Sequence, residues 1–247
     1  MELVLGNKWL EDDDATLAES GVSADSGVMA VVSKRVVKGR RMDDWDDEAT
    51  TYDLTDPDRG VIVEIPDGTT EISHRAFAGC EALAIVTIPD SVTCIGGEAF
   101  ISCSALTSLT LGESVRTIQT KAFHGCSALT TLEIPNSVKT IEWAAFEECH
   151  SLTHLRIGDS VTEIQGEAFF GCRSLTTLTI PDSVTSIGLL AFNSCSALAS
   201  LTIGHSVSKI GSSAFGGCTS LKKLTLPQRF PLEVFADRTA DCEIVLR

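Results

Sequence analysis

The stretch Ala122-Phe123-His124-Gly125-Cys126-Ser127-Ala128-Leu129 contains the pattern A-F-x-x-C-x-x-L, which occurs seven times in the chain. Its Ala-Phe pair lies at positions 76/77, 99/100, 122/123, 145/146, 168/169, 191/192 and 214/215, so each step is 23 residues with no insertion. A fixed period of this length is typical of solenoid proteins, in which successive repeats stack as coils. One coil cannot bury its own apolar face, so the core is expected to form by stacking.

The residues around this pattern predict the path of each coil. After Leu129 the chain alternates toward Leu132 and Ile134, and this period of two predicts a short strand with Leu and Ile facing inward. A V-x-x-I segment predicts a second, weaker extended stretch, and a helical turn is expected near the Ala-Phe pair. Pro (89, 135, 181) and Gly (112, 158, 204) alternate after the first strand from coil to coil. The sequence alone suggests no physical reason for that alternation.

Seven of the nine cysteines hold the same place in every repeat, at positions 80, 103, 126, 149, 172, 195 and 218. An odd number of cysteines at stacked positions is not a paired disulfide framework. Side chains in such a column point the same way, which also excludes the convergent geometry of a zinc site. We therefore predict a column of buried free thiols, which fits a reducing compartment.

The net charge of −15 argues against nucleic acid and anionic membranes as partners, because both are bound by clustered Lys and Arg. No run of 18 apolar residues is present, so membrane insertion is not expected. The start Met1-Glu2-Leu3-Val4 lacks the basic and apolar regions of a secretion signal. Together with the free thiols, this predicts an intracellular protein, cytoplasmic or nuclear.

Outside the repeats, residues 1–33 combine an apolar strand, a G-x-K-x-L-E-D segment, T-L-x-x-x-G-V and a closing strand. This segment resembles the C-terminal half of a ubiquitin-like domain. The resemblance implies a recognition patch at Val4, Met29 and Val31, although these residues would equally suit the core of a fragment. Residues 34–60, with a basic cluster followed by an acidic one, predict a charged linker. Residues 228–247 break the repeat and predict a C-terminal cap.

The motifs of residues 61–227 resemble the BspA-type, or Treponema-type, leucine-rich repeats. The resemblance implies a right-handed, β-rich leucine-rich-repeat solenoid of seven 23-residue repeats. Parallel strands would line its concave face and short helical turns its convex side. It also implies a role in protein binding or adhesion.

No catalytic motif is present, and the histidines and hydroxyl residues are scattered without a partnered base. Departures from the repeat are therefore the candidate partner-binding residues. Glu133 and Arg156 occupy an outward strand position that elsewhere holds Thr, and His154 shares the face of Arg156. A cross-strand ion pair between Glu133 and Arg156 is the alternative explanation.

A second departure is apolar. Trp143 and Leu189 share a column that otherwise holds His, Gly, Thr and Ser. Exposed aromatic residues often contribute binding energy, but local repacking of the convex side would also explain them.

We therefore expect a non-enzymatic protein-interaction module without a cofactor. Its partner would be another protein, with a link to the ubiquitin system suggested by residues 1–33. The alternative is a secreted or cell-surface adhesin of the BspA type.

Overall fold

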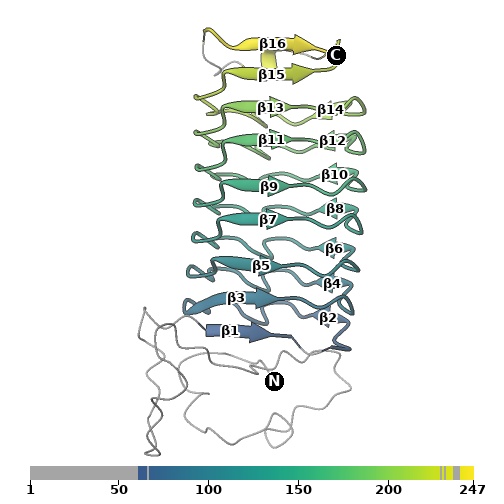
Figure 1. Cartoon of the computed structure of the whole chain (residues 1–247), viewed down its shortest axis with the longest axis vertical. Helices are drawn as coiled ribbons and strands as arrows, with labels where there is room; N and C mark the ends of the chain where they lie inside the picture. Colours follow the sequence, from purple (N-terminus) through teal and green to yellow (C-terminus); the bar gives the residue numbers. More distant parts are fainter. Residues whose placement is uncertain (1–60, 66, 229, 231, 236–239) are drawn as a thin grey trace, which may run out of the picture.

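The computed structural model describes residues 61–247, apart from 66, 229, 231 and 236–239. The predicted ubiquitin-like segment, its patch of Val4, Met29 and Val31, and the predicted charged linker lie outside the described residues. In the remainder, the coils stack into a column in which long strands form one side and shorter strands another (Figure 1). The predicted solenoid of parallel strands is confirmed.

Each coil contributes one long and one short strand. The long strands are β1 (Val61–Glu64), β3 (Leu83–Thr87), β5 (Ser108–Thr110), β7 (Thr131–Glu133), β9 (His154–Arg156), β11 (Thr177–Thr179), β13 (Ser200–Thr202) and β15 (Lys223–Leu226), followed by β16 (Glu243–Leu246). The short strands are β2 (Glu71–Ile72), β4 (Cys94–Ile95), β6 (Thr117–Ile118), β8 (Thr140–Ile141), β10 (Glu163–Ile164), β12 (Ser186–Ile187) and β14 (Lys209–Ile210). All pairings between them are parallel, and those from β2 to β15 join equivalent positions of neighbouring coils.

The Ala-Phe segment forms tandem hydrogen-bonded turns instead of the expected helical turn. In the third coil, Lys121 and Gly125 have φ angles of 57° and 73°, and such left-handed residues interrupt a right-handed helix. The N–H groups of Lys121, Phe123 and Gly125 donate to the carbonyls of the next coil at 2.8–2.9 Å. This turn side is therefore a third hydrogen-bonded ladder. Within the described ranges, the only helical segment is the 3-10 helix η2 (Leu232–Phe235).

The core consists of columns of identical side chains. The seven Phe rings of the repeats stack at centroid distances of 4.9–5.5 Å, with planes within 6° of parallel. Phe235 of η2 extends the column at 5.2 Å from Phe215. Beyond it, β16 pairs with β15. The C-terminal residues thus cover the last coil with an aromatic ring and a strand.

The cysteine column is explained by one repeated hydrogen bond. All nine cysteines are free, and six of the seven in the column are buried. The carbonyl of Phe100 accepts the N–H of Cys103 of its own coil at 3.3 Å and the thiol of Cys126 of the next coil at 3.3 Å. The thiol thus fills an apolar site and also satisfies a buried carbonyl. Burial raises the pKa of the Cys149 thiol to about 12.

The alternation of Pro and Gly has a physical cause, because the coils are packed in pairs. A Cβ added to Gly158 would overlap the carbonyl of Pro135 in the preceding coil, and the same holds for Gly112 on Pro89 and Gly204 on Pro181. Within each pair, the Asp or Asn after the Pro accepts the N–H of the residue after the Gly. Asn136 does so from Asp159 at 2.8 Å. A Pro coil and the Gly coil that follows it therefore form a unit of two repeats.

The pairing of coils coincides with breaks in the sheet of long strands. The short strands form one continuous seven-stranded sheet, but β5 is not paired with β7, and β9 is not paired with β11. Both breaks fall between one Pro–Gly pair of coils and the next, and Figure 1 shows the wider spacing at these points. At the third such boundary, β13 and β15 remain paired. The β7–β9 strand pair is thus set apart from its neighbours on both sides.

Candidate functional site

The outward face of the long strands is a surface of small hydroxyl residues interrupted at its centre. From β3 to β13, its outward positions hold Ser, Thr or Ile, except for Glu133 on β7 and His154 and Arg156 on β9. All three exceptions are exposed. The two strands that carry them are the pair isolated by the breaks in the sheet. The structure therefore brings these three candidates together on one small unit.

The charged side chains of this unit have no partner within it. Glu133 and Arg156 are directly opposite each other in the β7–β9 register. Nevertheless, the ion pairs within 4.0 Å in the described part of residues 61–247 do not include one between Glu133 and Arg156. The cross-strand ion pair of the alternative prediction is therefore not formed in this structure. His154 is held by its neighbour, with Nδ1 at 2.9 Å from the Thr153 hydroxyl.

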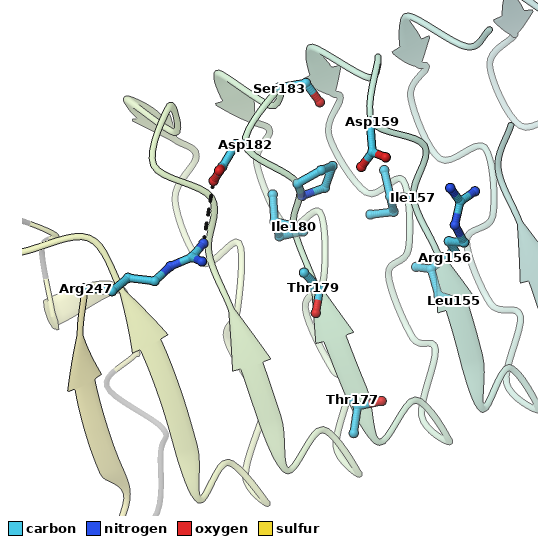
Figure 2. Close-up of a pocket in the computed structure, with 11 residues that line it drawn as sticks. Leu155, Arg156, Ile157, Asp159, Thr177, Thr179, Ile180, Asp182, Ser183 and Arg247 are labelled. Carbon is cyan, nitrogen blue, oxygen red and sulfur yellow. Dashed lines mark ion pairs between the residues drawn. The ribbon is translucent and has the colours of Figure 1, made fainter. Parts of the chain in front are cut away.

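A groove of about 660 Å³ opens beside Arg156, where β9 and β11 are unpaired. Figure 2 shows side chains of both coils around it, with Thr177 and Thr179 on β11 and Leu155 and Arg156 on β9. Within a coil pair, the N–H of Ile134 donates to the carbonyl of Arg156 at 2.9 Å. Across the groove, the equivalent hydrogen bond from the Ile157 N–H to the Thr179 carbonyl is missing. The groove thus presents main-chain groups as well as hydroxyls.

The far edge of the groove is fixed by a small charged cluster. The Arg247 guanidinium lies 3.5 Å from the Asp182 carboxylate, as Figure 2 shows, and also donates to the carbonyl of Ile203 at 3.0 Å. The N–H of His205 donates to the same carboxylate at 2.8 Å. This hydrogen bond is the main cause that lowers the pKa of Asp182. Asp182 is therefore an internally satisfied carboxylate, in contrast to Glu133.

The second pair of candidates lies on the turn side and is not part of this site. Trp143 and Leu189 are 38% and 42% exposed. The Trp143 ring lies against Gly166 of the next coil, because a Cβ on Gly166 would overlap the ring. Local packing therefore accounts for the position of the ring, while a large part of it still faces solvent.

The described part of the chain contains no cluster of three or more His, Cys, Asp or Glu side chains able to hold a metal ion. It also contains no helix that is long and apolar enough to span a membrane. Sequence reasoning identified the exceptional side chains but missed the groove and the sheet breaks. The breaks coincide with two of the three boundaries at which a Gly coil is followed by a Pro coil.

The repeat geometry agrees with comparisons to known proteins. The family model described as "BspA type Leucine rich repeat region" matches residues 61–176 and 144–237. The chain therefore belongs to the BspA-type leucine-rich repeat family. No curated protein matches the sequence.

Solved structures of leucine-rich repeat proteins were also found to be similar, and one of them, with a TM-score of 0.62, has the same architecture. The crystal structure of the leucine-rich repeat protein TpLRR of T. pallidum is similar to this chain, with 29% identity and a TM-score of 0.62 over 76% of this chain and 87% of that one. A leucine-rich repeat protein from Bacteroides ovatus has 24% identity and a TM-score of 0.38, covering 77% of this chain and 78% of that one. A leucine-rich cell surface protein from Faecalibacterium prausnitzii has 28% identity and a TM-score of 0.43, covering 67% and 66%.

Proposed function

We propose that this protein is a non-enzymatic binding scaffold that recognises another protein with the outward face of its long strands. The observation that carries this proposal is the exposed trio of Glu133, His154 and Arg156, since the other outward positions from β5 to β13 hold Ser or Thr. In a solenoid, the core positions are constrained by stacking, whereas the outward positions are free to specify a partner. These three depart from the repeat without making an ion pair inside the described fold.

The chemistry of the trio indicates what the partner must present. Arginine is enriched among residues that dominate binding energy, because its planar guanidinium binds carboxylates through two hydrogen bonds. Arg156 would bind an acidic group of the partner, and Glu133, opposite it on β7, would bind a basic one. Such a charge pattern discriminates against partners that reverse it. The groove between β9 and β11 would accept the partner side chain next to the carboxylate.

We further propose that the protein works in a reducing compartment inside the cell. The supporting observation is the column of free thiols, six of them buried. Membership of the BspA-type family favours the second candidate function, a surface adhesin. Labelling of intact host cells with an impermeant biotin reagent distinguishes the two, since only an adhesin would be labelled.

The link to the ubiquitin system rests on the resemblance of residues 1–33 alone. A benzoylphenylalanine photo-crosslinker placed at Met29 tests it in the full chain. The proposal requires a crosslinked species that contains a component of that system. The absence of any such species, with crosslinks from the strand face retained, would remove the link.

A photo-crosslinking experiment on the full chain tests the main proposal. The crosslinker replaces Thr131 on β7, beside the trio, and Glu163 on β10 serves as the matched control on the short-strand side. The proposal requires a discrete crosslinked partner from position 131 only. Equal yields of the same species from position 163 would contradict a strand-face site.

A variant that restores the repeat supplies the second half of the test. E133T, H154T and R156T together convert the exceptional residues to the residue type found at other outward positions of the long strands. Exposed substitutions of this kind leave stability within about 0.5 kcal/mol. The variant should therefore melt like the parent but lose the crosslink at position 131. A folded triple variant that retains the full crosslink would overturn the proposal.

A further inference from the structure

An apolar stripe crosses the turn side of the solenoid, and packing within the fold does not account for the apolar surface that it leaves exposed. We define the apolar stripe as Trp143, Gly166, Leu189 and Leu190, which belong to the fourth, fifth and sixth coils. Elsewhere in the repeats, the column of Trp143 and Leu189 holds small or polar residues such as Thr120 and Ser212. Trp143 and Leu189 are the large hydrophobic side chains most exposed on the repeats, at 38% and 42%.

The members of the stripe are linked through the backbone of the fifth coil. The Trp143 ring lies against Gly166, and the residue after that glycine, Glu167, donates its N–H to the carbonyl of Leu189 at 2.8 Å. Leu190 follows with a left-handed φ of 56° and is half-buried. A bulky side chain in place of Gly166 would displace the ring, so the sequence of the fifth coil matches the exposed indole.

The surroundings of the stripe are acidic. The turns of the fourth and fifth coils, residues 142–151 and 165–174, carry four carboxylates and one full cation, Arg173. Two of the carboxylates are engaged with the third coil: Glu142 accepts the N–H of Thr120 at 3.0 Å, and Glu147 lies 3.0 Å from His124 Nδ1. Two copies of this face would repel each other across a shared apolar contact. Charge complementarity instead favours a basic occupant.

The dimensions of the stripe select the shape of the occupant. Neighbouring parallel strands are about 4.8 Å apart, so Trp143 and Leu189, two coils apart, are separated by about 10 Å along the solenoid. Two turns of an α-helix rise about 10.8 Å, which places side chains i and i+7 at the same spacing. A helix lying along the solenoid axis would therefore set successive apolar residues on Trp143 and on Leu189.

We infer that the apolar stripe is a second docking surface, which binds an amphipathic helix of a partner protein with Lys or Arg flanking its apolar face. This inference is independent of the strand-face proposal, because the two surfaces belong to different columns of the repeat. It assigns Trp143 and Leu189 the role of contacting the apolar face of the helix. The Glu167 carboxylate would bind a flanking cation, whereas the Glu148 carboxylate lies 3.9 Å from His150 Nε2.

The test uses the full chain and a fluorescein-labelled synthetic peptide of about four helical turns. The peptide has Leu at the first and fourth positions of each seven-residue repeat, so that Leu recurs at i, i+3 and i+7, and Lys elsewhere. The control peptide has the same composition and charge, with its Leu residues spread around the helix. The inference requires the amphipathic peptide to bind at least tenfold more tightly. Equal binding of the two peptides would overturn it.

Protein variants locate the binding. W143T/L189S introduces the residue types of the equivalent coil positions and should weaken binding at least tenfold, whereas E133T/R156T on the strand face should leave the affinity unchanged. L189K is the second variant, because it leaves the contact of Trp143 with Gly166 in place. Unchanged affinity in folded L189K and W143T/L189S would overturn the inference. Binding of the amphipathic peptide that occurs only after the basic residues within 34–41 are replaced would also overturn the inference. In that case residues 34–41 of the chain itself would be the occupant of the stripe.

Discussion

High pH should destabilise this protein through its cysteine column, and replacing Cys149 by alanine should weaken that effect by a defined amount. Burial raises the pKa of the Cys149 thiol to about 12 in the folded protein, against an ordinary value of about 8.5. With rising pH, the unfolded chain therefore loses this proton first. The stabilisation is fully present below pH about 8.5 and is lost as the pH rises toward 12.

The magnitude follows from proton linkage. At pH about 10, ionisation of this thiol in the unfolded chain lowers the free energy of unfolding by about 2 kcal/mol. Burial also raises the pKa of five further column thiols, namely Cys80, Cys103, Cys126, Cys172 and Cys195. These shifts act in the same direction, so the solenoid should be less stable at pH about 10 than at neutral pH.

The assay is denaturant unfolding followed by far-ultraviolet circular dichroism under reducing conditions, at pH about 7.5 and about 10, for the parent and C149A. The cavity left by alanine affects both pH values equally, and lysine and tyrosine ionisation is common to both proteins. C149A should therefore lose about 2 kcal/mol less than the parent between the two pH values. Equal losses in both proteins, within about 0.5 kcal/mol, would refute the reasoning that these buried thiols resist ionisation.

Three further predictions follow from the packing. Gly158→Ala should lower the free energy of unfolding by about 1–3 kcal/mol, because its Cβ would overlap the Pro135 carbonyl. Gly97→Ala, where the nearest atom to the new Cβ is 3.3 Å away, is the control in the same denaturation assay, and equal losses would contradict the pairing of coils. Phe146→Ala should cost about 3–5 kcal/mol, because it opens a cavity between two stacked rings; a loss under about 1 kcal/mol would show that the column collapses around the gap. Iodoacetamide should label the half-buried Cys94 in the native protein before any buried column thiol, and mass spectrometry showing the reverse order would mean that the coils open locally.

The inward residues could be predicted from sequence because stacking repeats the same requirement in every coil. Leu132 and Ile134 alternate with outward residues, and both are buried as expected. The departures from the repeat were visible for the same reason, since Glu133 and Arg156 stand in a column of threonines. A strict period makes every exception recognisable without a structure.

Other features depend on contacts between coils that no single repeat encodes. The turn before Ala122 resembles a helical turn in composition, but the left-handed φ of Lys121, an ordinary residue, arises because its N–H must reach the next coil. The missing pairing of β9 with β11 depends on how one pair of coils meets the next. The contact of Trp143 with Gly166 joins residues of different repeats, which only the stacking of the coils brings together.

The pairing of Pro and Gly coils means that the structural repeat of this solenoid is two coils long, whereas the sequence period is one coil. Removing a single coil would bring two Pro turns or two Gly turns into contact, and the Asp or Asn of one turn would lose the N–H that it accepts. Removing or inserting two coils restores every contact. Chains of this design should therefore lengthen and shorten in steps of 46 residues, twice the period of 23. A designer extending the scaffold would copy two coils at a time, starting at a proline turn.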